Sequence, residues 1–152
     1  MKNFTSILIF SALVPVACAV AVAADTSAPA PQVGAAATPA VAIELFVDEP
    51  WLSAIRDGKK TVEGRAGPRQ EFAGWIGQTA KFYSAKQALL VRIIDVHHYA
   101  TLSEFLTAEG WQNAAPHLSS LQATEKAYLE FYPGDYIRDH GGMNGIMISL
   151  QP

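Results

Sequence analysis

The sequence predicts an α+β fold: a small, partly open β-barrel of about five mostly antiparallel strands with flanking helices. Three observations favour this class. From Ile43 onward the predicted order is β-α-β-β-β-α-α-β, which does not alternate strand and helix regularly. Five short strands with helices towards the ends are typical of a small open barrel. The 152 residues allow one domain with appendages.

The segment Met1–Ala24 has the pattern of a secretory signal peptide. Lys2 provides a short positive region, an apolar run without charge follows, and small residues before Asp25 offer cleavage sites. A retained membrane anchor is the alternative, although Pro15 interrupts the run. A lipoprotein signal at Cys18 is disfavoured, because proline stands where leucine is usual. We therefore expect export to the periplasm or out of the cell, with no stable membrane partner once the leader is cleaved.

Residues 25–42 are rich in Ala, Pro and Thr and predict an extended linker. Only Lys2 and Asp25 carry charge before the domain, residues 43–152, which leaves the domain with ten basic and thirteen acidic residues. This balance excludes binding of nucleic acid by overall charge alone and requires a local patch. Cys18 is the only cysteine, so the domain has no disulfide, no cysteine-ligated zinc and no cysteine nucleophile.

The first strand is predicted over Ile43–Val47, where apolar and polar residues alternate. A short amphipathic helix follows over Trp51–Arg56, with Asp48 as its N-cap and Gly58 as the residue that stops it. Thr61–Arg65 predicts the second strand. A loop rich in glycine and proline is expected next, over residues 66–77.

Thr79–Tyr83 and the β-branched segment Ala88–Tyr99 predict two further strands. Ser103 is expected to cap a helix that ends at Gly110, and Ser119 or Ser120 a longer helix through Phe131. Gly145–Leu150 is the expected closing strand.

Chemistry is concentrated in the segment Gly58-Lys59-Lys60-Thr61-Val62-Glu63-Gly64-Arg65. In a strand that starts at Thr61, the side chains of Thr61, Glu63 and Arg65 share one face, and Lys60 lies at the junction with the helix. A lysine, a carboxylate and a guanidinium are thereby held close together and could bind a phosphate or the edge of a base. The alternative is an ordinary solvated strand face with an ion pair.

This segment, together with Glu49-Pro50-Trp51 before it, resembles the opening of ASCH (activating-signal-cointegrator homology) domains, and the match covers nearly all of residues 43–151. Later landmarks of the family follow in order: Gly77 before a strand, the strand that ends at His98-Tyr99, a Leu-Ser-Glu-Phe-Leu helix, the pair Glu109-Gly110, the aromatic residues Tyr128, Phe131 and Tyr132, and a final apolar strand.

The resemblance implies a PUA-like β-barrel with a cleft beside Gly58–Arg65 and an association with RNA. One bacterial branch of the family hydrolyses the acetyl amide of N4-acetylcytidine with a Lys-Thr-Glu set, and some members are described as ribonucleases. By position, that lysine falls on Lys60, and the glutamate falls on Glu109 with a one-residue gap. The threonine falls on Glu63, which cannot be a hydroxyl nucleophile. Lys60, Glu63 and Glu109 are the catalytic candidates that this resemblance implies.

Other side chains are weighed by their position. Tyr128 and Tyr132 lie on one predicted helix face, and one of them could reach the cleft as a ligand-binding residue and stack on a base, although most aromatic residues lie in a core. Five of the ten basic residues of the domain fall within residues 56–69, which favours an anionic ligand over a solvated basic face. His97 and His98 are adjacent in a strand and point to opposite faces, so neither a metal nor another cofactor is expected.

We therefore predict a module that binds RNA or a nucleotide or nucleoside in a cleft near Lys60, Glu63 and Arg65. The alternative is a small hydrolase acting on a modified nucleoside, like an N4-acetylcytidine amidohydrolase, or on RNA, in which Lys60 tunes or supplies a base and Glu109 orients water or substrate. A third interpretation is a domain kept for protein contacts. Lys60 is expected at the cleft rim, where its replacement changes stability little. The sequence leaves the oligomeric state open.

Overall fold

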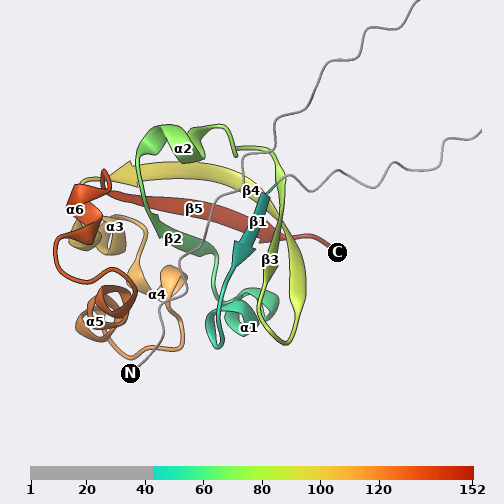
Figure 1. The fold of residues 1–152 in the computed structure, drawn as a ribbon. Coiled ribbons are helices and arrows are strands. Elements are labelled where there is room, and N and C mark those ends of the chain that lie inside the picture. The colour runs from blue at the N-terminus through green and yellow to red at the C-terminus, as the bar shows by residue number, and fades with distance from the viewer. Residues whose placement is uncertain (1–42) are drawn as a thin grey trace, which may run out of the picture. The chain divides into compact units, whose positions relative to one another are not determined.

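The computed structural model describes residues 43–152, which are organised around one five-stranded sheet (Figure 1). The strands are β1 (Ile43–Phe46), β2 (Val62–Ala66), β3 (Thr79–Tyr83), β4 (Ala88–Tyr99) and β5 (Met143–Leu150). The helices are α1 (Trp51–Arg56), α2 (Arg69–Ala73), α3 (Leu102–Ala108), α4 (Trp111–Ala114), α5 (Leu121–Phe131) and α6 (Tyr136–Asp139). None of these six helices has the length and apolar character needed to span a membrane.

The sheet curls into a partly open barrel. Its strand order is β1-β3-β4-β5-β2, with β1 parallel to β3 and all other neighbours antiparallel. The pairing of β4 with β5 is irregular between Ile93 and Asp95, where a bulge bends the long strand. The two edge strands come within the reach of one side chain, because Arg65 Nη2 on β2 donates a 2.7 Å hydrogen bond to the carbonyl oxygen of Phe46 on β1. The predicted fold class is therefore confirmed.

Strand alternation divides the buried side chains between two faces of the sheet. The inner face and α1 and α2 enclose one core, with Phe82, Ile93 and Ile146 at 0% exposed. The outer face of β2, β5 and the end of β4 packs against a second core built by α3, α4, α5 and α6 around Phe105 and Tyr128. Figure 1 shows α3, α5 and α6 gathered on one side of the curled sheet.

Two expected caps differ from those in the structure. Helix α3 is capped by Thr101 rather than Ser103: Thr101 Oγ1 accepts the N–H of Glu104, and the Glu104 carboxylate accepts the N–H of Thr101. This reciprocal pair is a capping box. Thr101 is the cap because Glu104 lies three residues after it, the spacing that a capping box requires. At α1, Pro50 and not Asp48 occupies the N-cap position, and no side chain caps the helix.

The other differences concern short elements. The predicted loop over residues 66–77 contains α2, which begins after Pro68, and α4 and α6 are further helices that the sequence did not indicate. Helices of four or five residues are too short for a helical repeat to show in the sequence. Strand β5 begins at Met143, two residues earlier than predicted. The leader and linker predicted for residues 1–42 lie outside the described residues.

Candidate ligand-binding site

Three charged side chains predicted to lie together, Lys60, Glu63 and Arg65, do meet in the structure; we call them the charged cluster. Lys60 Nζ lies 3.2 Å from Glu63 Oε2, and Arg65 Nε lies 2.9 Å from Glu63 Oε1. Gly58, with a φ of 69°, turns the chain out of α1 just before the cluster. Glu63 and Arg65 both lie on the inner face of β2, two residues apart. One carboxylate therefore bridges two cations.

Lys60 is buried and does not lie at a cleft rim. The residue is 2% exposed, and its ammonium donates to the carbonyl oxygens of Val62 at 2.7 Å and Ala114 at 2.5 Å, in addition to its ion pair with Glu63. An ammonium group has three N–H donors, so all three are used inside the protein. The expected position at a cleft rim is therefore wrong, and with it goes the reason for expecting a small effect on stability, because this buried side chain joins β2 to α4.

The aromatic ring of Trp51 covers the same ammonium. The ring centroid lies 5.0 Å from Lys60 Nζ, within the range of a cation–π contact. The rings of Tyr128 and His117 pack edge-on against Trp51 at centroid distances of 5.6 Å and 4.5 Å. Burial, assisted by the nearby charge of Lys60, lowers the pKa of His117. Water is thus kept from Lys60 by the first helix and by the segment that precedes α5.

Burial and ion pairing have opposite effects on the pKa values of the two cations in the cluster. Burial lowers the pKa of Lys60, and the carboxylate of Glu63 works against that shift. Burial also lowers the pKa of Arg65, but the charge of Glu63, helped by Tyr132 and Tyr128, outweighs this effect, and the pKa of Arg65 is raised overall. The guanidinium therefore stays charged, and two cations with one carboxylate leave the cluster with a positive balance suited to an anion.

Arg65 is the member of the cluster that reaches the surface, with 24% of its side chain exposed. Its Nε–H is buried and, among the described residues, has no hydrogen-bond partner, because the short distance to Glu63 is not matched by the direction of the N–H. Nη2 is held by the carbonyl of Phe46, whereas no described group accepts a hydrogen bond from Nη1. The guanidinium is thus fixed at one end, and Nη1 is the donor group left for a ligand, because Nε is buried.

Two tyrosines of α5 follow the edge of β2. The backbone of Gly64 lies against the Tyr128 hydroxyl, and the backbone of Ala66 against the Tyr132 hydroxyl. One helical turn on α5 therefore matches two residues along the strand. Burial raises the pKa of both phenols. Tyr128 is 5% exposed and does not present its ring to a ligand, whereas Tyr132 is half-buried.

Gly64 is a residue of this site that the sequence analysis did not single out. A Cβ atom at this position would lie 2.6 Å from the Tyr128 hydroxyl and 2.8 Å from the ring of Phe105. Only glycine lets both side chains approach the strand this closely. The signal was present in the motif, but the residue that needs the space lies more than sixty positions away along the chain.

Glu109 does not join the charged cluster. Its Oε1 accepts a 2.5 Å hydrogen bond from the Tyr99 hydroxyl and lies 2.8 Å from His97 Nδ1, and its side chain packs against Gly145. These partners lie on the outer face of the sheet, opposite the face of Glu63. The catalytic set of Lys60, Glu63 and Glu109 is therefore not assembled in this structure, because Glu63 points to the inner face of β2 whereas Glu109, at the end of α3, packs on the outer face.

The two adjacent histidines point to opposite faces, as predicted. His97 faces outward to Glu109, whereas His98 Nδ1 lies 3.0 Å from Oδ1 of the buried Asn144. The Asn144 amide in turn donates to the carbonyl of Gly67 at 2.8 Å, so its oxygen is the atom that accepts from His98. Within residues 43–152, no three His, Cys, Asp or Glu side chains are placed to hold a metal ion.

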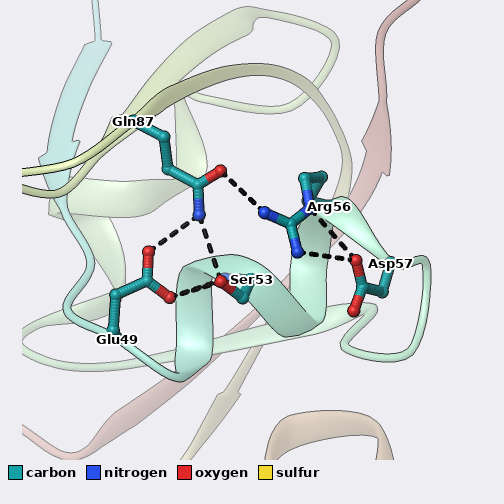
Figure 2. Close-up of polar contacts among 5 residues, drawn as sticks. All are labelled: Glu49, Ser53, Arg56, Asp57 and Gln87. Atoms are coloured by element: carbon teal, nitrogen blue, oxygen red, sulfur yellow. Dashed lines mark hydrogen bonds and ion pairs between the residues drawn. The ribbon is translucent and has the colours of Figure 1, made fainter.

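A second polar network, shown in Figure 2, joins the start of α1 to the β3–β4 hairpin. Glu49 accepts hydrogen bonds from Ser53 Oγ at 2.6 Å and Gln87 Nε2 at 2.7 Å, and these bonds lower its pKa. Arg56 Nη1 donates to Gln87 Oε1 at 3.2 Å, and Arg56 also pairs with Asp57 at 3.0 Å. The donors and acceptors of this network satisfy one another, which indicates a structural role.

Two surface pockets lie away from the charged cluster. One, of about 490 Å³, borders the network of Figure 2 and includes Glu49, Ser53 and Lys86. The other, of about 530 Å³, lies beside α3 and includes His98 and Ser103. Neither of these two pockets is lined by a member of the charged cluster.

Comparison with known proteins gives one family and a set of similar structures. The profile of the ASCH domain family matches residues 45–140. The crystal structure of the hypothetical protein PH0355 is similar at 27% identity and a TM-score of 0.63, over 71% of this chain and 97% of that one. The solution structure of PF0455 from Pyrococcus furiosus is similar at 27% identity and a TM-score of 0.57, over 71% and 96%.

A crystal structure of a ZmASCH mutant from Zymomonas mobilis also matches, at 16% identity and a TM-score of 0.44, over 72% of this chain and 66% of that one. A comparison with curated proteins found no match.

Proposed function

The chain belongs to the ASCH domain family, and we propose that it binds RNA, a nucleotide or a nucleoside at the charged cluster through the guanidinium of Arg65. The family is associated with RNA binding, which supports the class of ligand. The observation that carries the proposal is the state of Arg65: it is charged, partly exposed, paired with Glu63, and its Nη1 has no accepting group among the described residues.

The three members of the cluster take different roles in this proposal. Arg65 contacts the ligand, because a planar guanidinium fits the oxygens of a phosphate or the acceptor edge of a guanine. Glu63 orients the guanidinium from the inner side at 2.9 Å. Lys60 is a positioning residue, since its three donors are used and it fixes Glu63 and the start of β2. The charge of Arg65 acts on the phenol of the half-buried Tyr132, whose ring stacks on Tyr136 with centroids 5.5 Å apart, so a base would stack on the other face of that ring.

The test compares two arginine substitutions in the full chain, with binding measured by calorimetry against nucleosides, nucleoside monophosphates and short RNAs. Arg65→Gln should weaken binding of the best ligand by about 1.5–3 kcal/mol, or tenfold or more, because a charge-assisted contact is lost. Arg69→Gln removes the same charge from an exposed position nearby and should change affinity little. Equal affinities of the Arg65→Gln variant and the parent protein would show that the ligand lies elsewhere.

The hydrolase remains the second candidate, and one observation favours it. Burial lowers the pKa of Lys60, and a neutral amine is the form that acts as a general base. Two features weigh against it: Glu63 stands at the position of the nucleophilic threonine, and Glu109 lies on the other face of the sheet. Product formation from N4-acetylcytidine or RNA by the parent protein, lost in Lys60→Met with binding retained, would favour the hydrolase.

We also propose that the domain works outside the cytoplasm. The support is the pattern of Met1–Ala24 alone, which lies outside the described residues. An exported domain would meet free nucleosides or foreign RNA rather than the RNA of its own cytoplasm, so the ligand screen should include both single nucleosides and short RNAs.

A further inference from the structure

One face of the sheet lacks a helix over it among the described residues. The second core, on the outer face of the sheet, contains side chains of β2, β5 and the end of β4, but none from β1, β3 or the first half of β4. Figure 1 shows the β3–β4 hairpin on the side of the sheet away from α3, α5 and α6. We call this region the open face; its outward side chains include Glu44, Phe46, Lys81, Tyr83, Leu90 and Arg92.

Strand alternation and pairing bring these side chains together. Their neighbours along each strand point into the inner core, so the residues of the open face must point outward. Pairing places Phe46 beside Tyr83, and Lys81 between Glu44 and Leu90. Two aromatic rings therefore lie side by side on adjacent strands, next to a row that carries a lysine.

The open face combines one exposed and one half-buried aromatic ring, Phe46 and Tyr83, with cations. Phe46 is 45% exposed and packs edge-on against Tyr83 with ring centroids 5.8 Å apart. Lys81 Nζ lies 5.6 Å from the centre of the Tyr83 ring and 3.2 Å from Glu44. Arg92 is exposed, and no described carboxylate pairs with it. Rings that can stack on bases beside cations that can contact phosphates are the combination by which proteins bind single-stranded nucleic acid.

The open face is continuous with the charged cluster. The carbonyl oxygen of Phe46 accepts the hydrogen bond from Arg65, while the ring of Phe46 packs on Tyr83. Phe46 therefore connects the guanidinium of Arg65 with the rest of the open face. A ligand that contacts Arg65 and is longer than one nucleotide has this aromatic and cationic surface directly beside it.

We propose that the open face is the binding surface for single-stranded RNA beyond the nucleotide at Arg65, with bases stacked on Phe46 and Tyr83 and phosphates beside Lys81 and Arg92. The inference rests on the proposed function for its class of ligand. It adds the path of the RNA, which runs from Arg65 on β2 to the other edge strand, β1, and on to β3. Stacking gives no sequence preference, so the surface should accept any unpaired base.

The test is a length series with the full chain, using uridine monophosphate and hexauridylate as probes. Hexauridylate should bind more tightly than the monophosphate. Tyr83→Leu and Phe46→Leu keep an apolar side chain but remove the ring, and each should weaken hexauridylate binding about fivefold or more. Tyr83→Leu, which lies away from Arg65, should leave binding of the monophosphate unchanged. Arg92→Gln should lower the salt dependence of hexauridylate binding by about 0.7 in the slope of log affinity against log salt.

The controls separate this inference from the proposed function. Lys126→Gln removes an exposed cation from α5 and should leave the length series unchanged. Arg65→Gln should weaken both probes. If hexauridylate binds no more tightly than the monophosphate, or if the leucine variants leave it unaffected, the open face is not the RNA surface, whether or not Arg65 binds a nucleotide.

A second copy of the chain is the competing occupant of the open face. Sedimentation at increasing concentration decides between the two: a dimer that Tyr83→Leu dissociates, in a protein whose affinity shows no dependence on RNA length, would overturn the inference. Thermal unfolding of each variant shows that it is folded. Should Phe46→Leu unfold, Tyr83→Leu and Arg92→Gln still carry the test, since both positions are on strands paired on both sides.

Discussion

At Lys60 a single ammonium group meets three acceptors inside the protein, two carbonyls and the carboxylate of Glu63. Lys60→Met should therefore lower the free energy of unfolding by about 3 kcal/mol or more, because Glu63 loses a buried partner and two carbonyls lose their donor. Denaturant unfolding measures the change. Lys59→Met is the matched control, since Lys59 is exposed, and it should stay within about 0.5 kcal/mol of the parent. A Lys60→Met protein as stable as the Lys59→Met control would contradict the structural role.

Gly64 makes the second prediction at the scale of one residue. Gly64→Ala introduces a Cβ 2.6 Å from the Tyr128 hydroxyl and 2.8 Å from Phe105, so one of these side chains must move. The cost of such overpacking is about 1–3 kcal/mol. Gly74→Ala is the control, because nothing lies within 4 Å of its added Cβ and its backbone is helical. A melting midpoint of Gly64→Ala equal to that of Gly74→Ala would show that Phe105 on α3 and Tyr128 on α5 can move aside without loss of stability.

At the scale of elements, the network of Figure 2 joins α1 to the β3–β4 hairpin through Glu49. Its hydrogen bonds lower the pKa of Glu49 below the ordinary value of 4.5, so the folded state favours the ionised carboxylate. The stabilisation is present above that ordinary value and is lost as the pH falls through the lower pKa of the folded state. Stability measured against pH should therefore fall in this acid range.

The substitution Glu49→Gln tests the origin of that fall. It should lower the thermal midpoint at neutral pH and flatten the acid side of the curve, because the group that titrates is gone. Asp57→Asn is the control in the same network, since the exposed pair of Arg56 and Asp57 contributes little. An unchanged pH profile in Glu49→Gln would assign the acid sensitivity to other carboxylates.

At the scale of the whole molecule, the sequence predicts that Met1–Ala24 is removed on export. Intact-mass measurement of the protein made in a secreting host should show loss of the leader, with a new N-terminus near Asp25. A chain of full mass in the membrane fraction would establish the retained anchor instead. A chain of full mass in the soluble cytoplasmic fraction would remove the prediction of export.

The elements that the sequence determined are those with local signals. The strands Thr79–Tyr83 and Ala88–Tyr99 and the long helix capped by Ser120 were predicted with nearly their final bounds. Alternation over a few residues was enough to place Glu63 and Arg65 on one face beside Lys60. The family resemblance rested on the same motif together with the later landmarks in their order along the chain, and the match of the family profile to residues 45–140 confirmed it.

Tertiary structure alone decided the roles of those residues. Lys60 is buried because the carbonyl of Ala114, far along the chain, comes to its ammonium, and Arg65 joins two edge strands because the sheet curls. Glu109 is separated from Glu63 because Gly145 and His97 present the outer face of β5 and β4 to it. Local periodicity specifies that side chains alternate along a strand. Which face of the strand meets a distant partner depends on long-range pairing and packing, and no local pattern contains that information.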